Sequence, residues 1–554
     1  MTFQFELTKT GQLNKCADIP RGLVVPTSPD LTRIAALVDE WMHECISNHP
    51  LCNSGINEAS QPFPTRLLSV GSNTSPTIRL LHTSGKQGRY AALSHCWGPS
   101  QPLKTTRASL AAHCRSISMN QLPKTFLDAV HVTRSLGLQY LWIDSLAILQ
   151  DDPDDWKREA VKMGSVYGNA YITIAASRST SSDSGFLGLR TQDKVVKICP
   201  SGSTPFHIGL RHSFADDTDG APLARRAWVL QEMILSQRIL HFTSTQMYWD
   251  CWTRHQGEDL DNLFLGVFKK DAYPPSLAPG TNDDDHHTSQ KSNTPRQWWH
   301  LLSSYTGCEL TYQSDKLIAI SGLVERITER TGQKSIAGYF EDRLHEGLLW
   351  SACNFPFEHR PELHLPSWSW ASRKGRINHV QLYSWAVNDK LRLKYTGLDS
   401  TAVLQGELRR LRLNVIYSDM KNAASNPDHF FPYELDYYST NFRHVSPAWL
   451  KDTDEVGWLT LDTDNGQAVD WMQIGWVVVA CNVDTDEEVN KVEVCADVDD
   501  ATCNTVERAA AAKEGPFYCM LVRQKAGNIY ERVGIGSIGS LSWFTDDRTD
   551  IVIA

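Results

Sequence analysis

Two hydrophobic periods alternate in a fixed order between residues 90 and 177. Short apolar runs at Tyr90–Trp97, Tyr140–Ile143 and Ala170–Ala176 are separated by helical patterns at Pro123–Leu136 and Asp152–Tyr167. Short apolar runs bounded by turn residues predict buried strands, and a period near 3.6 residues predicts amphipathic helices. This alternation is typical of right-handed βαβ units. We therefore expect an α/β fold with a Rossmann-like, parallel βαβαβ core at 90–177.

Weaker patterns surround this core. Helices are predicted at Leu31–Ile46, Pro222–Leu235, 298–306 and 315–331; paired strands at Pro64–Leu68 with Thr77–Leu81 and at Ile239–Phe242 with Gln246–Cys251; and a strand at Leu365–Ser372. After residue 380, short alternating runs separated by turns predict a mostly β domain. The expected organisation is a helical lead-in at 1–60, an α/β domain at 61–270, a polar insert at 271–295, a helical extension at 296–378 ending in the Pro-Ser-Trp-Ser-Trp-Ala-Ser strand, and a β-rich domain at 379–554.

Polar side chains share apolar faces on two of these helices. Glu159 falls in the arc formed by Trp156, Met163 and Val166. A carboxylate aimed at a core must be paired, protonated or in contact with a cavity, so Glu159 is either half of a buried pair or a site residue. On the helix at 222–235, Glu232 shares a face with aromatic and aliphatic residues. We expect that helix to pack on the core, with Arg226 pairing with Asp144 or Glu159.

Composition excludes several classes of function. The formal net charge of −10 and the absence of a Lys/Arg block argue against nucleic acid as a partner. The most apolar run, Ile474–Cys481, is too short to span a bilayer as a helix. The 13 cysteines are an odd number, and the first residues lack the pattern of a signal peptide, so we expect free thiols and a cytoplasmic location.

Two local clusters have the residue types of reactive sites. Cys45, His49 and Cys52 form a C-x3-H-x2-C group. A closed zinc site needs four ligands, and no nearby second pair completes the set, so we expect two buried thiols at a helix end and no metal. Ser94 and Cys96 flank a histidine, but neighbouring residues on a strand point to opposite faces, so His95 would not activate either of them in place.

Several motifs, taken in order, resemble fungal heterokaryon incompatibility (HET) domain proteins. They are Tyr90–Gly98 (YAALSHCWG), Leu122–Ala129, Leu136–Ser145, Gln150–Asp152, Asp155–Glu159, Met163–Ala170 and Arg226–Glu232. The similarity extends to Cys45–Cys52, Pro64–Leu68, Asp315–Leu323 and Pro366–Ser372, so it covers roughly residues 40–375 and places a HET domain at 61–270. The family commonly has Tyr in place of His95 and Cys in place of Ala147, which excludes a catalytic thiol at position 147.

The resemblance implies non-self recognition and regulated cell death after fungal cell fusion. HET domains are also regarded as distant relatives of TIR domains, some of which cleave NAD at the nicotinamide glycosidic bond with a glutamate. By that analogy Glu159 and Asp144 are the catalytic candidates. Substrate contacts are expected from Ser94, Cys96, Trp97, Ser145, Arg226 and Glu232. NAD would then be a substrate, and neither a cofactor nor a metal is expected.

Three functions from different classes remain open at this stage. The HET domain is a cell-death effector that hydrolyses NAD or a related nucleotide, a non-enzymatic signalling module that acts by self-association, or another hydrolase with Cys96 or Ser94 as its nucleophile. The partner would be an incompatibility protein that the sequence does not identify. Release of nicotinamide from NAD separates the first function from the other two.

Overall fold

The computed structural model describes most of the N-terminal two thirds of the chain and the strands of the C-terminal third. The described residues are 25–53, 61–99, 102–191, 195–198, 206–209, 213–259, 273–274, 277, 294–341, 344–352, 358–359, 363–379, 385–387, 392–396, 401–408, 446–449, 455–461, 474–482, 517–538 and 549–553. Most of the polar insert predicted at 271–295, and the first 24 residues of the predicted lead-in, lie outside them. The contacts divide the chain into two compact units, 1–297 with 308–332 and 298–307 with 333–554.

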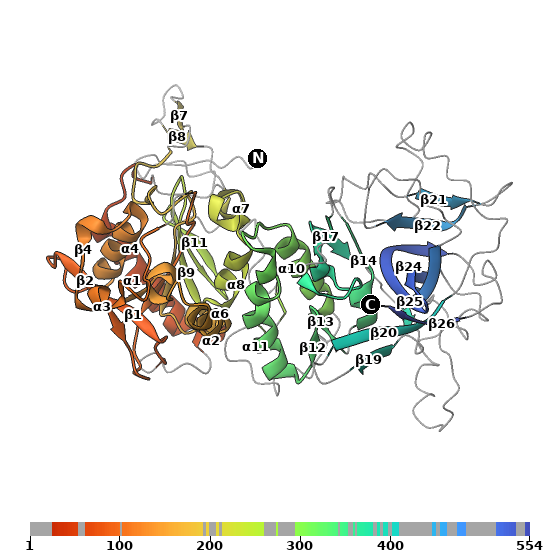
Figure 1. The fold of residues 1–554 in the computed structure, drawn as a ribbon. Helices are drawn as coiled ribbons and strands as arrows, with labels where there is room; N and C mark the ends of the chain where they lie inside the picture. The colour runs from red at the N-terminus through yellow and green to blue at the C-terminus, as the bar shows by residue number, and fades with distance from the viewer. Residues whose placement is uncertain are drawn as a thin grey trace. The chain divides into compact units, whose positions relative to one another are not determined.

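The first unit is built on a mixed nine-stranded sheet (Figure 1). The strands lie in the order β11 (His255–Gly257), β10 (Met247–Cys251), β9 (Arg238–Phe242), β6 (Ile172–Ala175), β3 (Ala91–Ser94), β5 (Tyr140–Trp142), β1 (Arg66–Ser69), β2 (Thr77–His82) and β4 (Ile117–Ser118). The four central strands β9, β6, β3 and β5 are parallel, and every strand outside them pairs antiparallel. The middle strands β3 and β6 are buried along their whole length.

Helices cover both faces of this sheet. From β3 the chain crosses through α4 (Lys124–Ser135) to β5, and from β5 it returns through α6 (Pro153–Gly168) to β6 on the other side of β3. Right-handed crossovers in opposite directions place their helices on opposite faces. α8 (Ala227–Leu235) and α11 (Ser321–Thr331) pack against α6, whereas α1 (Leu31–Asn48) packs against α4 and β10.

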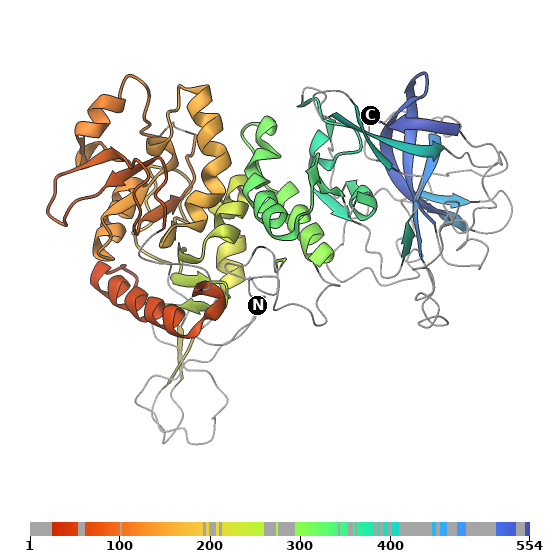
Figure 2. The same cartoon turned by 90° about the horizontal axis from the view of Figure 1, so that it is seen from below.

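Local sequence explains where the main helices begin. Asp152 caps α6 by accepting hydrogen bonds from the backbone N–H groups of Asp154 and Asp155, and Pro153 occupies the first turn. Asp30 caps α1, the long red helix in Figure 2, in the same way. α1 buries Ile34, Val38, Trp41, Met42 and Cys45, which recur at helical spacing.

Shorter elements complete the first unit. They are α2 (Pro50–Asn53), α3 (Leu110–Arg115), α5 (Asp144–Ala147), α7 (Phe214–Asp219), the hairpin of β7 (Val195–Ile198) with β8 (Phe206–Gly209), and 3-10 turns at Met119–Gln121, Pro222–Arg225, Gln313–Asp315 and Ile318–Ile320.

The second unit contains the C-terminal β region. Its larger sheet has the order β18 (Trp385–Val387), β23 (Ile474–Asn482), β24 (Phe517–Ala526), β25 (Ile529–Ile538), β26 (Thr549–Ile553), β20 (Thr401–Leu408) and β19 (Arg392–Thr396), with β22 (Glu455–Leu461) pairing with β25 and with β21 (Ser446–Trp449). Smaller pairs are formed by β12 (Ser335–Ile336) with β13 (Tyr339–Phe340), β14 (Trp350–Ala352) with β17 (Ile377–His379), and β15 (Glu358–His359) with β16 (Arg373–Lys374). Most of α10 (Thr294–Thr306) and all of α12 (Leu344–Leu348) belong to this unit.

The α/β class, the parallel pairing of the three core strands and the C-terminal β region are therefore confirmed. Both predicted hairpins are also present, with Leu67 opposite Leu81 in one and Trp249 opposite Leu240 in the other. The finer description as Rossmann-like or TIR-like stays a prediction, since the sheet carries antiparallel strands on both sides of its parallel centre.

Two predicted elements differ from the structure. The helix expected at 222–235 is interrupted at Arg226, whose backbone is extended (φ −87°, ψ 128°), because the N–H of Ala227 donates to the carbonyl of Glu309. The segment 365–372 is not a strand but a turn followed by a 3-10 helix at Trp370–Ser372. There the Ser369 hydroxyl accepts the N–H of Ala371 and donates to the carbonyl of Ala337, so one local and one long-range side-chain bond take the place of a strand ladder.

Candidate functional site

A cluster of polar side chains lies where the parallel strands β3 and β5 end. Ser94 is the last residue of β3, and its hydroxyl donates to Oε2 of Glu232 on α8 at 2.5 Å. Both residues are buried, with exposed fractions of 0% and 4%. The carboxyl ends of parallel strands are where α/β sheets usually place their binding sites. The helix at 227–235 thus packs on the core as expected, and it delivers a carboxyl group to this edge.

Burial controls the protonation of Glu232. It raises the pKa of this carboxyl group to about 7, although the neighbouring Arg226 guanidinium and the hydrogen bond from Ser94 act in the opposite direction. A carboxyl group that changes charge near neutral pH can serve as a general acid or base. Glu232 can therefore gain or lose a proton near neutral pH.

Asp144 and Trp97 form the partly exposed side of the same cluster. The indole N–H of Trp97 donates to Oδ2 of Asp144 at 2.8 Å, and the backbone N–H of Ser145 donates to Oδ1 at 2.7 Å. Asp144 begins the short helix α5 directly after β5. The Ser145 hydroxyl instead donates to the carbonyl of Leu103, so this predicted contact residue has a structural partner.

Arg226 contacts the loop after β3. Its guanidinium donates to the carbonyl of His95 rather than pairing directly with Asp144 or Glu159, as had been expected. This difference follows from the break at Arg226, which sends the side chain from the start of α8 toward β3. Burial raises the pKa of both Glu232 and Cys96, and the nearby positive charge of Arg226 offsets only part of that rise.

Cys96 and His95, which follow Ser94 in the chain, have little capacity to act as a nucleophile and its base. Burial raises the pKa of the Cys96 thiol, which packs among apolar residues such as Ala175 and Val229. Burial also lowers the pKa of His95 to about 4, and the His95 ring lies edge-on against Phe126, 5.1 Å between centroids. A protonated thiol beside a neutral, differently directed imidazole does not form an activated pair.

Tyr167 is a member of the cluster that was not among the predicted site residues. Its hydroxyl donates to the carbonyl of Leu93 and also interacts with Glu232. The signal was present in the sequence, because Tyr167 lies in one of the family-like motifs and carries a polar group on a buried helix face.

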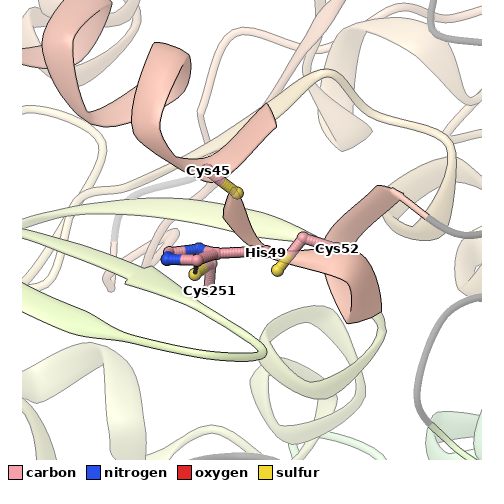
Figure 3. Close-up of side chains that lie close together, drawn as sticks. All are labelled: Cys45, His49, Cys52 and Cys251. Atoms are coloured by element: carbon pink, nitrogen blue, oxygen red, sulfur yellow. Dashed lines mark hydrogen bonds between the residues drawn. The ribbon is translucent and has the colours of Figure 1, made fainter. Parts of the chain in front are cut away.

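A second group of side chains is formed by residues far apart in the chain (Figure 3). Cys45, His49 and Cys52 are joined by Cys251 of β10, and all four side chains are buried. The fourth side chain comes from a residue far along the chain, so the absence of a second pair nearby in the sequence does not leave the set incomplete. This group lies at the end of α1, where Cys251 pairs with Arg238 at the start of β9, whereas Ser94 and Glu232 meet at the carboxyl end of β3.

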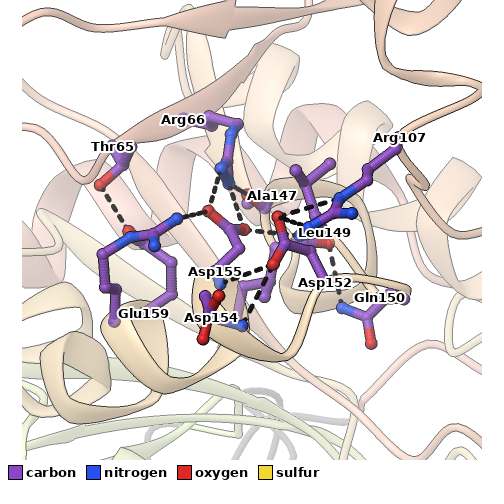
Figure 4. Close-up of polar contacts among 12 residues, drawn as sticks. Thr65, Arg66, Arg107, Ala147, Leu149, Gln150, Asp152, Asp154, Asp155 and Glu159 are labelled. Atoms are coloured by element: carbon purple, nitrogen blue, oxygen red, sulfur yellow. Dashed lines mark hydrogen bonds and ion pairs between the residues drawn. The ribbon is translucent and has the colours of Figure 1, made fainter.

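Glu159 has partners other than Asp144 and Glu232, and its contact with Thr65 is drawn in Figure 4. Its Oε1 accepts a hydrogen bond from the Thr65 hydroxyl at 2.8 Å and lies 3.1 Å from the Lys162 ammonium. The side chain is buried, as its helix position predicted, but Lys162 is half exposed. Thr65 and Lys162 also contact an open hollow of about 490 Å³. The partners of Glu159 do not include Asp144, the other predicted catalytic carboxylate, because Glu159 lies on the part of α6 that faces the segment before β1.

A buried ion pair lies beside Glu159 on the same helix. Arg66 of β1 contacts both carboxylate oxygens of Asp155 at 2.5 and 3.0 Å, and the N–H of Leu149 donates to Oδ2 (Figure 4). The exposed fractions of the two side chains are 5% and 3%. Asp155 thus joins α6 to β1, a role that no local sequence pattern indicates.

The pKa of Glu232 predicts how stability depends on pH. Between pH 4.5 and 7 the folded protein retains a proton on Glu232 that the unfolded chain has released, so the stability contributed by the protonated form is complete below this window and is lost as pH rises through it. The expected loss is up to about 3 kcal/mol. Glu232→Gln, which cannot ionise, should lack this part of the slope in pH-dependent thermal unfolding. Identical slopes for the two proteins would contradict the assignment.

The residues of the Ser94–Glu232 cluster lie in a segment that matches a known protein family. The family model described as heterokaryon incompatibility protein (HET) matches residues 90–232, a range that begins just before β3 and ends at Glu232. No curated protein and no solved structure matches the chain. Among the described residues, no helix is both long and apolar enough to cross a membrane. The segment that holds Ser94, Asp144, Arg226 and Glu232 is thus the segment in which this chain is similar to the heterokaryon incompatibility family.

Proposed function

We propose that this protein is a fungal incompatibility effector, active in non-self recognition and cell death, whose HET segment hydrolyses the glycosidic bond of NAD or a related nucleotide. The observation that carries the proposal is the buried Glu232 carboxyl group, 2.5 Å from the Ser94 hydroxyl at the carboxyl edge of the parallel strands. The match to the HET family supports the biological role. The chemistry is our inference from the side chains of the cluster.

The half-buried residues of the cluster have the properties needed to bind a dinucleotide. Arg226 provides a guanidinium group, which suits phosphate oxygens because of its planar set of donors. Trp97 provides an aromatic ring held by its hydrogen bond to Asp144, and such rings stack on bases. Because these groups form the exposed side of the cluster, a bound nucleotide would lie above Ser94 and Glu232.

The ionised Glu232 would act on the ribose. As the bond between C1′ and the nicotinamide nitrogen breaks, the electron pair leaves with nicotinamide and positive charge develops on the ribose. A carboxylate beside that charge stabilises it, and it can then accept a proton from the water that attacks C1′. Since burial raises the pKa of Glu232 to about 7, activity should rise with pH through that value.

The test is nicotinamide release from NAD by the purified full-length chain. Glu232→Gln should reduce the rate by about 10²-fold or more, because an interaction that stabilises the transition state is lost. Glu159→Gln is the matched comparison, since it removes another buried carboxylate of the same segment. We expect Glu159→Gln to stay within a few-fold of the wild-type rate, because Lys162 and Thr65 already satisfy that group.

Two outcomes would argue against the proposal. An intact, folded Glu232→Gln protein that releases nicotinamide at the wild-type rate would remove Glu232 from the chemistry, and a strong loss in Glu159→Gln instead would return the role to Glu159. If both variants kill cells on expression as well as the wild type does, and no nicotinamide is released, a non-enzymatic module that self-associates becomes the better explanation.

A further inference from the structure

Four metal-ligating side chains converge in the interior of the first unit. The Sγ atoms of Cys45, Cys52 and Cys251 and a ring nitrogen of His49 all lie within 4.8 Å of one another (Figure 3). The three cysteines are 0% exposed and His49 is 7% exposed. All three thiols are free, so no disulfide explains why they lie together.

Local structure directs three of these ligands to one point. Cys45 is in the last turn of α1, His49 follows the helix end, and Cys52 is on the short helix α2. The Asn53 side chain donates to the carbonyls of Cys45 and His49, and the N–H of Cys52 donates to the carbonyl of His49. These hydrogen bonds hold the turn in a shape that presents all three side chains to the end of β10.

The spacing of the ligand atoms matches a tetrahedral zinc site. With Zn–S bonds near 2.3 Å and Zn–N bonds near 2.0–2.1 Å, ligand atoms of a tetrahedron lie roughly 3.6 Å apart for nitrogen to sulfur and roughly 3.8 Å for sulfur to sulfur. The distance from Cys251 Sγ to His49 Nδ1 is 3.4 Å. We propose that Cys45, His49, Cys52 and Cys251 bind one structural zinc ion.

The chemistry of the ligands and their surroundings favours zinc over other metals. Three thiolates and an imidazole form a soft donor set of the kind that selects zinc, and four protein ligands leave no open position for catalysis. Three thiolates around Zn²⁺ carry one net negative charge. The buried Arg238 offsets it, because its Nε donates to Cys45 Sγ at 3.5 Å. Thr253 Oγ1 lies 3.7 Å from Cys52 Sγ, so a second ligand also has a polar neighbour.

The zinc ion would join two distant parts of the sequence. Three ligands come from the segment before β1 and the fourth from β10, so the metal fixes α1 and α2 to the sheet. This role is independent of the proposed nucleotide chemistry, because none of the ligands belongs to the Ser94–Glu232 cluster.

The test is the metal content of the full-length protein purified without chelators. Mass spectrometry of the metal should give about one zinc per chain. After exchange for Co²⁺, the protein should show absorption bands of tetrahedral Co²⁺ and charge-transfer bands from thiolate ligands. Cys251→Ser and His49→Ala should lose the metal, and His49→Cys should retain it, since a set of four cysteines also binds zinc.

Cys114→Ser is the matched control, because Cys114 is a free, partly buried cysteine on α3. This variant should keep its zinc. Folded wild-type protein without metal, a disulfide within the cysteine cluster, or full zinc occupancy in Cys251→Ser would each overturn the proposal. Should Cys251→Ser fail to fold, the wild-type stoichiometry and the Co²⁺ spectrum decide the question.

Discussion

Asp155→Ala should destabilise the first unit by about 3–5 kcal/mol, because it leaves the Arg66 guanidinium buried without its carboxylate. The loss is larger than for a surface pair, since the side chains of both partners are at most 5% exposed. Asp155 also accepts the N–H of Leu149, which would be left without this acceptor. Calorimetry of the full chain should show the transition of this unit lowered by on the order of 10 °C.

Neighbouring substitutions separate this effect from a general loss of negative charge. Asp154→Ala removes an exposed acid from the same helix turn and should cost less than about 1 kcal/mol. The double variant Arg66→Met with Asp155→Leu removes both charges and should recover most of the stability. If Asp155→Ala and Asp154→Ala have the same melting temperature, the ion pair between Arg66 and Asp155 contributes little to stability.

Gly164→Leu should destabilise the same unit by about 3 kcal/mol, because α6 and α11 cross with their backbones in contact. A Cβ atom built at Gly164 would lie 2.8 Å from the Cα of Gly322, and a Cβ at Gly322 would meet the Cα of Gly164 at the same distance. Backbone atoms cannot rotate away as a flexible side chain can, so one helix would have to shift. The N–H of Gly322 would then lose its hydrogen bond to the Gln231 side chain.

The control for this substitution is the next residue on the same helix. Ser165 is exposed, so Ser165→Ala should leave the thermal midpoint nearly unchanged. Gly164→Ala should fall between the two variants, because alanine gains about 1 kcal/mol in helix propensity while still making the short contact. Equal midpoints for Gly164→Leu and the wild type would show that the crossing is looser than the structure indicates.

The sequence was sufficient to predict the parallel core, because neighbouring residues determine where each of its helices and strands begins and ends. The Asp152-Pro153 cap and the turn at Gly137 mark helix ends through short-range hydrogen bonds and backbone preference. Predictions failed where a distant residue changed the local balance. The backbone of Arg226 is extended because Ala227 bonds to Glu309, which lies about eighty residues further along the chain.

The candidate site was only partly accessible from sequence for a similar reason. Helix periodicity correctly placed Glu159 and Glu232 on buried faces, since burial depends on the angle around one helix. It could not distinguish their partners, because those lie on other elements. Glu232 accepts a hydrogen bond from the Ser94 hydroxyl at the carboxyl edge of the sheet. Glu159 instead accepts a hydrogen bond from the Thr65 hydroxyl and forms an ion pair with Lys162.

The cysteine cluster shows the same division between sequence and tertiary structure. The sequence alone placed Cys45, His49 and Cys52 within eight residues at the end of a predicted helix, so their side chains could not lie far apart. The turn that directs them to one point is held by hydrogen bonds from the Asn53 side chain. Only the tertiary structure decided that Cys251, about two hundred positions further along, completes the set. Its place depends on the packing of α1 against β10, and such long-range contacts are set by the burial of whole faces rather than by any local spacing.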